Sequence, residues 1–327
     1  MNRNILVTGG AGYIGSHTVM ELIKNGDNVI VYDNLPMGNE FNRPNVDCVR
    51  GDIGDYDLVK STLTENNIDA VVHFAASTYV EESVSEPKKY YMNNIANGIV
   101  LLDAILDSGV DKIVFSSSCA VYGAPEKIPI DESEKLSPIN PYGRAKLMFE
   151  QILGDYDQAY GLKSVRLRYF NAAGADSSGK IGERHDPETH VLPLLIQAVI
   201  NHRKDFSVFG TDYDTKDGTC IRDYVHVTDL AIAHLKATEY LFQNNRSEYF
   251  NLGSGEGTTV MELIRAVEKI SGVKLNVRKE ERRRGDADTL IADINKANAL
   301  LNWHPAHSSI DNIVKTAWEW HTGAGRK

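Results

Sequence analysis

The sequence predicts an α/β fold in which a doubly wound parallel sheet is joined to a second, smaller α/β domain. Three observations support this prediction. Short apolar runs alternate with helical patterns through the first half of the chain, a glycine-rich turn follows the first of those runs, and longer polar loops appear after Asn171. The length of 327 residues is also enough for about two domains.

Apolar patterning places the strands and helices of the first half. Continuous apolar runs are typical of strands buried on both faces of a parallel sheet, and we expect them at residues 5–8, 28–32, 70–74, 112–115 and 165–169. Helical patterns occupy residues 13–24, 90–106 and 141–160, and Pro141 suits the first position of the last helix. Such alternation predicts right-handed βαβ crossovers.

Composition excludes several classes of function. The chain has 45 Asp and Glu against 35 Lys and Arg, a net charge of −10. Because an acidic surface repels nucleic-acid phosphates and anionic lipids, we expect neither a nucleic-acid nor a membrane partner. Cys48, Cys119 and Cys220 fit neither a disulfide framework nor a zinc ribbon. With no signal peptide and no long apolar run, we expect a cytoplasmic protein.

A phosphate-binding turn is predicted between the first strand and the first helix. Gly9, Gly12 and Gly15 have the spacing G-x-x-G-x-x-G there. Glycines let the backbone approach a pyrophosphate, and the helix N-terminus supplies positive charge. Asp33, which ends the second strand, can accept hydrogen bonds from ribose hydroxyls and would repel a 2′-phosphate. The arrangement predicts a Rossmann domain that binds NAD.

A tyrosine and a lysine lie four residues apart on the helix at 141–160. Tyr142 and Lys146 therefore share one helix face. A free tyrosine, with a pKa of about 10, is a poor base, but a neighbouring Lys⁺ and a cationic nicotinamide favour the phenolate. The serines at 116–118 end a strand at the edge where doubly wound sheets bind ligands. A surface Tyr and Lys, and a serine that caps a helix, are the structural alternatives.

These motifs together resemble the extended short-chain dehydrogenase/reductase family. The resemblance rests on residues 9–15, 33, 74–76, 93, 116–123 and 142–146, and it covers nearly the whole chain. Within that superfamily, residues 90–94, 168–171, 222–227 and 283–286 are similar to the UDP-glucose 4-epimerase family.

The resemblance implies a redox-neutral isomerase that interconverts UDP-galactose and UDP-glucose at C4. Tyr142 would take the proton of the sugar 4-hydroxyl while C4 gives hydride to tightly held NAD, and the 4-keto sugar would turn and receive the hydride on its other face. Ser118 would be the hydroxyl partner, with Ser117 as the alternative. The implied cofactor positions are Gly9, Gly12, Tyr13, Ile14, Gly15, Asp33, Asn34, Asp52, Ile53, Phe74, Ala75, Ala76, Asn93, Ser118, Tyr142, Lys146 and Phe170. Asp52 is equally explained as a helix cap.

An acidic protein needs local guanidinium groups to bind a diphosphate. By resemblance, Arg222 and Arg283 have that role and Asp286 binds the uridine ribose. Without the resemblance, we would interpret Arg222 as paired with Asp223 and the arginines at 282–284 as a solvated basic turn. The implied substrate positions are Ser118, Tyr142, Asn171, His190, Val191, Val208 and Phe209 (which flank the uracil), Arg222, Tyr224, Arg283, Asp286 and Leu290.

Domains, assembly and specificity complete the expectations. Residues 1–170 form the NAD-binding domain, to which the chain returns around 224–252, and residues 171–223 and 253–327 bind the nucleotide sugar. The family suggests a homodimer, with the helix at 90–106 as a candidate surface. Leu290 stands where some relatives have a tyrosine that limits room for a 2-acetamido group, which predicts some activity on UDP-N-acetylglucosamine and UDP-N-acetylgalactosamine. His185 and His190 have no metal-ligand spacing, so we expect a solvated pair and no metal.

Related enzymes and a binding module are the alternatives. Nucleotide-sugar 4,6-dehydratases place an Asp-Glu pair just after the strand-end hydroxyl, and UDP-glucuronate decarboxylases keep a Glu there, whereas this chain has Cys119 and Ala120. A non-catalytic dinucleotide-binding module has no need for Ser118, Tyr142 and Lys146 together. A one-way reductase would release its cofactor.

Overall fold

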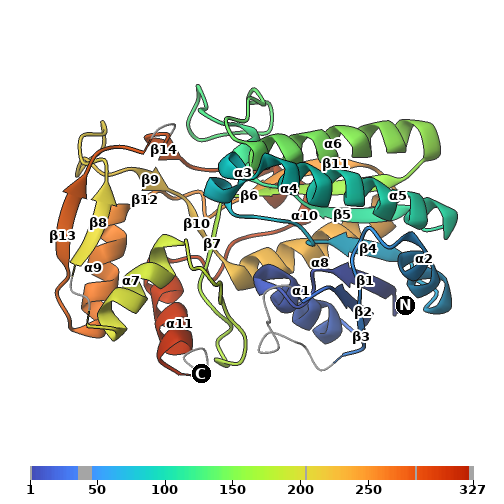
Figure 1. Cartoon of the computed structure of the whole chain (residues 1–327), viewed down its shortest axis with the longest axis horizontal. Coiled ribbons are helices and arrows are strands. Elements are labelled where there is room, and N and C mark those ends of the chain that lie inside the picture. Colours follow the sequence, from blue (N-terminus) through green and yellow to red (C-terminus); the bar gives the residue numbers. More distant parts are fainter. Residues whose placement is uncertain (1, 36–45, 203–204, 284–285, 324–327) are drawn as a thin grey trace.

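The larger sheet of the protein is fully parallel. The structure is a computed structural model that describes residues 2–35, 46–202, 205–283 and 286–323. Within these ranges the sheet has seven strands in the order β11-β6-β5-β4-β1-β2-β3 (Figure 1). They are β1 (Asn4–Thr8), β2 (Asn28–Asp33), β3 (Cys48–Arg50), β4 (Ala70–His73), β5 (Lys112–Ser116), β6 (Lys163–Tyr169) and β11 (Glu248–Leu252). The predicted doubly wound sheet is confirmed.

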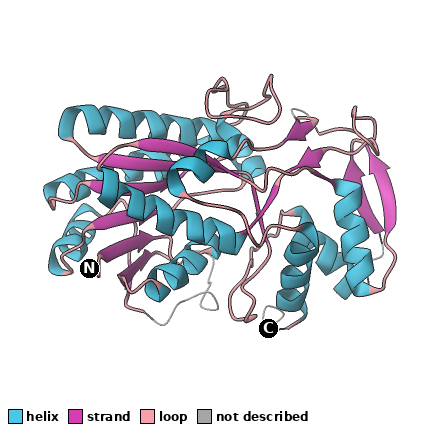
Figure 2. Ribbon diagram, turned by 180° about the vertical axis from the view of Figure 1, so that it is seen from behind, coloured by secondary structure: helices cyan, strands magenta, loops and turns pink. Residues whose placement is uncertain are grey.

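Helices cover both faces of this sheet. They are α1 (Tyr13–Lys24) and α8 (Val227–Asn244) on one face, and α2 (Tyr56–Glu65), α5 (Asn97–Asp107) and α6 (Pro141–Tyr160) on the other (Figures 1 and 2). Adjacent strand residues serve different faces: Val7 and Val72 pack under α1 and α8, whereas Leu6 and Val71 pack under α2 and α5. Burial on both faces explains why these strands are continuously apolar.

The predicted single helix at 90–106 is instead three consecutive segments. After the short helix α3 (Val80–Ser85), α4 (Pro87–Tyr91) leads into a π-helical turn, Met92–Ala96, and then into α5. The side chain of Asn94 fixes this turn, because its Oδ1 accepts a hydrogen bond from the Ser77 backbone nitrogen (2.8 Å) and its Nδ2 donates to the Ser77 carbonyl oxygen (3.0 Å). Single π-helical turns of this kind are frequent at functional sites.

The second part of the chain packs around its own core, on the left of Figure 1. Leu195, Leu263 and Val314 meet there from three different helices. The remaining elements are η3 (Cys119–Val121), β7 (Asn171–Ala173), α7 (Val191–Ile200), β8 (Asp205–Phe209), β9 (Ile221–Arg222), β10 (Tyr224–His226), β12 (Thr258–Thr259), α9 (Val260–Ser271), β13 (Asn276–Glu280), β14 (Thr289–Leu290), α10 (Asn295–Leu301) and α11 (Ile310–Thr322). Among the helices described, none has both the length and the apolar character needed to cross a bilayer.

Buried histidines make the fold sensitive to acid. Burial lowers the pKa of His73 and His226 to about 3, and that of His17 and His234 to about 4. Unfolded histidines protonate near pH 6.5, so between about pH 4 and 6.5 the unfolded chain binds more protons and stability falls as the pH falls. We predict a lower urea midpoint at about pH 5 than at about pH 7.5, with a smaller difference in the variant His234→Gln. Equal midpoints for the unmodified protein would contradict this prediction.

Candidate active site

The turn after β1 lies where the strand order of the sheet reverses. β1 and β4 are neighbours although β2 and β3 separate them in sequence, and ligands bind beside such switch points. Gly9 has a φ of +71°, and a Cβ there would lie 2.6 Å from the Ala75 backbone nitrogen. A Cβ on Gly15 would lie 2.2 Å from the Gly9 carbonyl oxygen. Both positions therefore need glycine, which keeps the backbone of the turn close to the sheet edge.

The N-terminus of α1 is open to an anion. Its N-cap, Gly12, has extended backbone and no side chain hydrogen-bonds to the first turn. The Gly12 nitrogen donates to the Gly9 carbonyl oxygen (3.1 Å), and the first helical bond runs from Ser16 to Gly12 (3.0 Å). The backbone N–H groups of Tyr13 and Ile14 point from this end and can bind a phosphate.

The carboxylate of Asp33 closes the other side of the turn. Asp33 is 9% exposed, and it accepts hydrogen bonds from the backbone nitrogens of Ala11 (3.0 Å) and Leu35 (2.9 Å). Two acceptor positions on its oxygens remain for ribose hydroxyls, since an ionised carboxylate offers about four. The open helix end and this carboxylate fit the diphosphate and the ribose of NAD.

Asp52 links two neighbouring segments and does not cap a helix. Its Oδ1 accepts from Asn97 Nδ2 (3.0 Å) and its Oδ2 from Asn34 Nδ2 (3.2 Å). The cap of α2 is Asp55, whose side chain accepts from the Leu58 nitrogen. The helix-cap interpretation of Asp52 is therefore wrong, and Asp52 with Asn34 stays available to the cofactor.

Tyr142, Ser118 and Lys146 lie together beyond the end of β5. The side chains of Tyr142 and Ser118 are hydrogen-bonded, and Lys146 Nζ lies 5.8 Å from the centre of the Tyr142 ring. Lys146 is buried and donates to the Ser116 carbonyl oxygen (2.6 Å). A Cβ on Gly143 would lie 2.5 Å from a backbone oxygen of η3, so α6 packs directly against the segment that contains Ser118.

Local sequence explains where α6 begins. Asn140 is the N-cap, and its Oδ1 accepts a hydrogen bond from the Gly143 nitrogen (2.8 Å). Pro141 follows at the first helical position, where it loses no intrahelical hydrogen bond. The helix ends at Tyr160, before Gly161 with its φ of +79°. The predicted bounds of 141–160 are confirmed, and they place Tyr142 in the first turn.

Burial shifts the pKa values of the Tyr142 and Lys146 side chains in opposite directions. It raises the pKa of Tyr142 well above its usual value, although the hydrogen bond from Ser118 opposes the rise. It lowers the pKa of Lys146 to about 7, opposed by the carboxylate of Glu150. The expected lowering of the Tyr142 pKa by Lys146 is thus not seen in the protein alone, because desolvation outweighs it.

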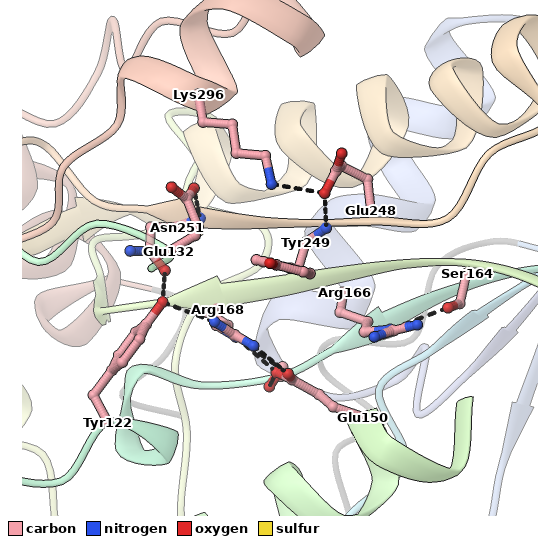
Figure 3. A network of polar contacts seen from close by, with 11 residues as sticks. Tyr122, Glu132, Glu150, Ser164, Arg166, Arg168, Glu248, Tyr249, Asn251 and Lys296 are labelled. Carbon is pink, nitrogen blue, oxygen red and sulfur yellow. Dashed lines mark hydrogen bonds and ion pairs between the residues drawn. The ribbon is translucent and has the colours of Figure 1, made fainter. Parts of the chain in front are cut away.

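A buried ion pair fixes α6 to β6. Arg168 Nη2 donates to Glu150 Oε2 (2.6 Å) and Arg168 Nε to Glu150 Oε1 (3.0 Å), and both side chains are 3% exposed (Figure 3). Arg168 Nη1 also donates to the Tyr122 hydroxyl (3.0 Å), which in turn donates to Asn251 Oδ1 (2.7 Å). Sequence reasoning missed Glu150, although its position four residues after Lys146 places it on the same helix face.

The same ion pair separates the two candidate serines. Ser117 Oγ donates to Glu150 Oε1 (2.5 Å), so its hydroxyl is held away from Tyr142. Ser118 Oγ instead accepts from the Ala120 nitrogen (3.2 Å) and shares a hydrogen bond with Tyr142. Of the two serines left open by the sequence, only Ser118 faces the tyrosine.

Two arginines share one carboxylate in the second part of the chain. Arg222 Nη2 donates to Asp286 Oδ1 (3.3 Å), and Arg283 Nε donates to Asp286 Oδ2 (3.1 Å). The Arg283 guanidinium lies 5.4 Å from the centre of the Phe209 ring. The expected alternative pair of Arg222 with Asp223 is wrong, because the Asp223 carboxylate accepts hydrogen bonds from the backbone at 254, 255 and 292. Arg284 and Gly285 lie outside the described residues.

The strand pattern separates two residues that were predicted to flank the same ligand group. Val208 belongs to the core under α7 and is 2% exposed, whereas Phe209 is 43% exposed, because neighbouring strand residues point to opposite faces. Tyr224 is buried in the same core as Val208. Leu290 pairs in register with Arg222 and packs against the cluster that contains Phe170.

The other predicted positions lie near the carboxyl edge of the sheet. The Phe74 ring lies 4.5 Å from the ring of His234, and Asn93 Nδ2 donates to Ser77 Oγ (3.1 Å). Their places in the fold are as follows: Phe74, Ala75 and Ala76 after β4, Ile53 after β3, Asn93 in the π-helical turn, Phe170 and Asn171 after β6, and His190 and Val191 at the start of α7. Tyr13 crosses between the two parts, because its hydroxyl donates to the Gly174 carbonyl oxygen (2.6 Å).

Comparison with known proteins fits this geometry. A sequence model of the NAD dependent epimerase/dehydratase family matches residues 5–253, which is more than half of the chain. The chain belongs to this family. Membership agrees with the glycine turn, Asp33 and the Tyr142–Lys146 pair, all of which lie inside the matched range.

Curated and solved members of the family resemble the chain over almost its full length. A UDP-glucose 4-epimerase from Rhizobium meliloti (strain 1021) is 51% identical over 98% of this chain and 98% of the relative. The UDP-glucose 4-epimerase of Brucella ovis, solved in complex with NAD, is 47% identical with a TM-score of 0.94 and 97% coverage of both chains. A UDP-glucose 4-epimerase from Stenotrophomonas maltophila, solved with NAD and formylated UDP-arabinopyranose, is 39% identical with a TM-score of 0.95 and 99% coverage of both.

The Glu150–Arg168 pair yields a test of stability. Glu150→Gln removes the charge but keeps the size, which leaves a buried guanidinium without its carboxylate. We predict a loss of about 3–5 kcal/mol of unfolding free energy in urea titrations. The matched control, Glu126→Gln, changes an exposed carboxylate and should alter it by less than about 0.5 kcal/mol. An equally small change in Glu150→Gln would show that the pair does not anchor α6.

Proposed function

We propose that the chain catalyses the reversible epimerisation of UDP-galactose and UDP-glucose at C4, through a 4-keto intermediate and with tightly bound NAD. The observation that carries the proposal is the contact of Tyr142 with Ser118 and Lys146, at the same sheet edge as the glycine turn. The names of the relatives support the substrate and the reaction.

In this proposal Tyr142 is the proton acceptor for the sugar 4-hydroxyl. Ser118 holds the same sugar oxygen by a hydrogen bond, and Lys146 keeps the Tyr142 ring in place and favours its ionised form. When bound, NAD supplies a hydride acceptor and donor for C4 and, when oxidised, a positive charge near the site. The high pKa of Tyr142 in the protein alone indicates that the phenol stays protonated until a cation is nearby.

Inversion at C4 needs a sugar that can turn while the nucleotide stays fixed. Arg222 and Arg283 would bind the UDP moiety, because guanidinium groups match phosphate oxygens, and Asp286 would accept from the ribose once an arginine turns to the diphosphate. The exposed ring of Phe209 offers a face for the uracil. We assign residues 171–223 and 253–327 to this nucleotide-sugar part, and residues 1–170 with 224–252 to the NAD part.

The rival reactions lack a group in the right place. Elimination or decarboxylation in related enzymes uses a carboxylate directly after the strand-end serine, where this chain has Cys119 and Ala120. Burial raises the pKa of the Cys119 thiol to about 12, so it is no proton donor of suitable strength near neutral pH. A non-catalytic binding module gives no reason for the burial of Lys146 beside Tyr142.

Assembly and location belong to the same proposal. Met92 and Met148 are exposed on neighbouring helical segments, and such paired apolar surface supports a homodimer. A cytoplasmic location is proposed from the expected absence of a targeting segment.

A variant of the proton acceptor tests the function. Purified protein should convert UDP-galactose to UDP-glucose with no NAD added, and Tyr142→Phe should lower kcat by about 10²–10⁴-fold while the cofactor remains bound. The matched control is Tyr169→Phe, which removes another partly buried hydroxyl, bonded to Ser116 Oγ (2.9 Å). A full rate in Tyr142→Phe would refute the assignment, and no turnover by the unmodified protein would refute the proposed function.

Leu290 provides a test of substrate range. Its position beside Arg222 and near Phe170 places it close to the sugar in the proposed binding mode. We predict measurable turnover of UDP-N-acetylglucosamine, and suppression of that turnover in Leu290→Tyr with little change for UDP-glucose. The kcat/KM values for both substrates check this, and failure of the unmodified protein to act on the acetylated sugar would contradict it.

A further inference from the structure

Four ligand-type side chains converge in the segment before α7. Glu183, His185, Glu188 and His190 each offer a donor atom, and these atoms all lie within 4.8 Å of one another. His185 Nδ1 lies 3.3 Å from Glu183 Oε1 and 3.6 Å from Glu188 Oε1, and His190 Nδ1 contacts Glu183 Oε1. The expected solvated pair is therefore wrong: His185 has 17% of its side chain exposed, because the segment folds both histidines around two buried carboxylates.

Two donor atoms in this cluster have no hydrogen bond. The Glu188 side chain is 4% exposed, and its Oε1 accepts from the backbone nitrogens of Thr189 (2.7 Å) and His190 (2.8 Å). Its Oε2 is buried without a hydrogen-bond partner among the described residues, and so is His185 Nδ1. A buried polar atom left without a partner costs about 1–3 kcal/mol, so an additional ligand is required at this place.

The spacing and the donor types match a transition-metal ion. Ligands about 2.1 Å from a tetrahedral ion are about 3.4 Å from each other, close to the separations of His185 Nδ1 from the two carboxylates. Two imidazoles and two carboxylates suit Zn²⁺, whereas Mg²⁺ and Ca²⁺ take oxygen ligands. Two neutral histidines with two carboxylates would also balance a double positive charge.

The surroundings hold the ligands in place. The Glu183 carbonyl oxygen accepts a hydrogen bond from Trp320 Nε1 on α11 (2.8 Å), and the Tyr79 ring lies edge-on to His185 at 5.9 Å. A Cβ on Gly182 would lie 2.6 Å from the Trp320 ring. Supports of this kind orient ligands at metal sites.

We propose that Glu183, His185, Glu188 and His190 bind one divalent transition-metal ion of the Zn²⁺ type. The ion has no part in the proton transfer at Tyr142. It joins the two ends of the segment 183–190 and thereby fixes the start of α7. Binding of the ion does not depend on the proposed reaction.

Cobalt provides the test, because Co²⁺ replaces Zn²⁺ and absorbs visible light in sites with nitrogen and oxygen ligands. Untagged full-length protein is treated with a chelator, dialysed and titrated with Co²⁺. The expected result is a saturable visible band at one Co²⁺ per chain, abolished by Zn²⁺. The absence of such a band, or a thiolate charge-transfer band that indicates cysteine ligands, would overturn the proposal.

Variants of the ligands locate the site. His185→Gln and Glu188→Gln should each weaken Co²⁺ binding by more than about tenfold, since even groups that only support a ligand cost that much. The control, His304→Gln, changes an exposed histidine outside the cluster and should bind as the unmodified protein does. Circular dichroism verifies that each variant is folded. Unchanged binding in folded His185→Gln and Glu188→Gln would show that the ion binds elsewhere.

Discussion

The salt bridge between Glu150 and Arg168 sets the position of every group that the proposed reaction uses. Two charges that are almost fully buried must stay paired, because an unpaired one is strongly destabilising. Their pairing fixes the register of α6 against β6, and Tyr142 and Lys146 follow from that register by their places on the same helix. The Ser117 hydroxyl is held by the same carboxylate, which leaves the next residue, Ser118, to meet the phenol.

Electrostatics explain why the protein alone is not yet primed for proton transfer. Desolvation raises the pKa of Tyr142 and lowers that of Lys146 to about 7, so both groups favour their neutral forms near neutral pH. A cationic cofactor would reverse this preference for the tyrosine. The net charge of −10 has a parallel effect on the nucleotide side, where Arg222 and Arg283 are both paired with the single carboxylate of Asp286. A diphosphate would therefore compete with an internal anion for these cations.

Elements with local signals could be predicted from the sequence, and elements fixed by distant contacts could not. The bounds of α1 and α6 follow from a glycine turn and from Asn140-Pro141, which act within a few residues. The π-helical turn depends on hydrogen bonds between Asn94 and Ser77, which are 17 residues apart. The cluster around Glu183 forms from an irregular segment with no periodic pattern, and the roles of Val208 and Phe209 separate only once the face of β8 is known.

The hydrogen bond from Tyr13 to the Gly174 carbonyl oxygen has an evolutionary consequence. Tyr13 belongs to the first turn after the glycine loop, and Gly174 to the segment that leads toward the second core, so the contact ties together regions 161 residues apart. Exchange of either half for that of a distant homologue would break this link unless both partners were inherited together. Recombination between such genes is thereby restricted, and the two halves are expected to have diverged as one unit.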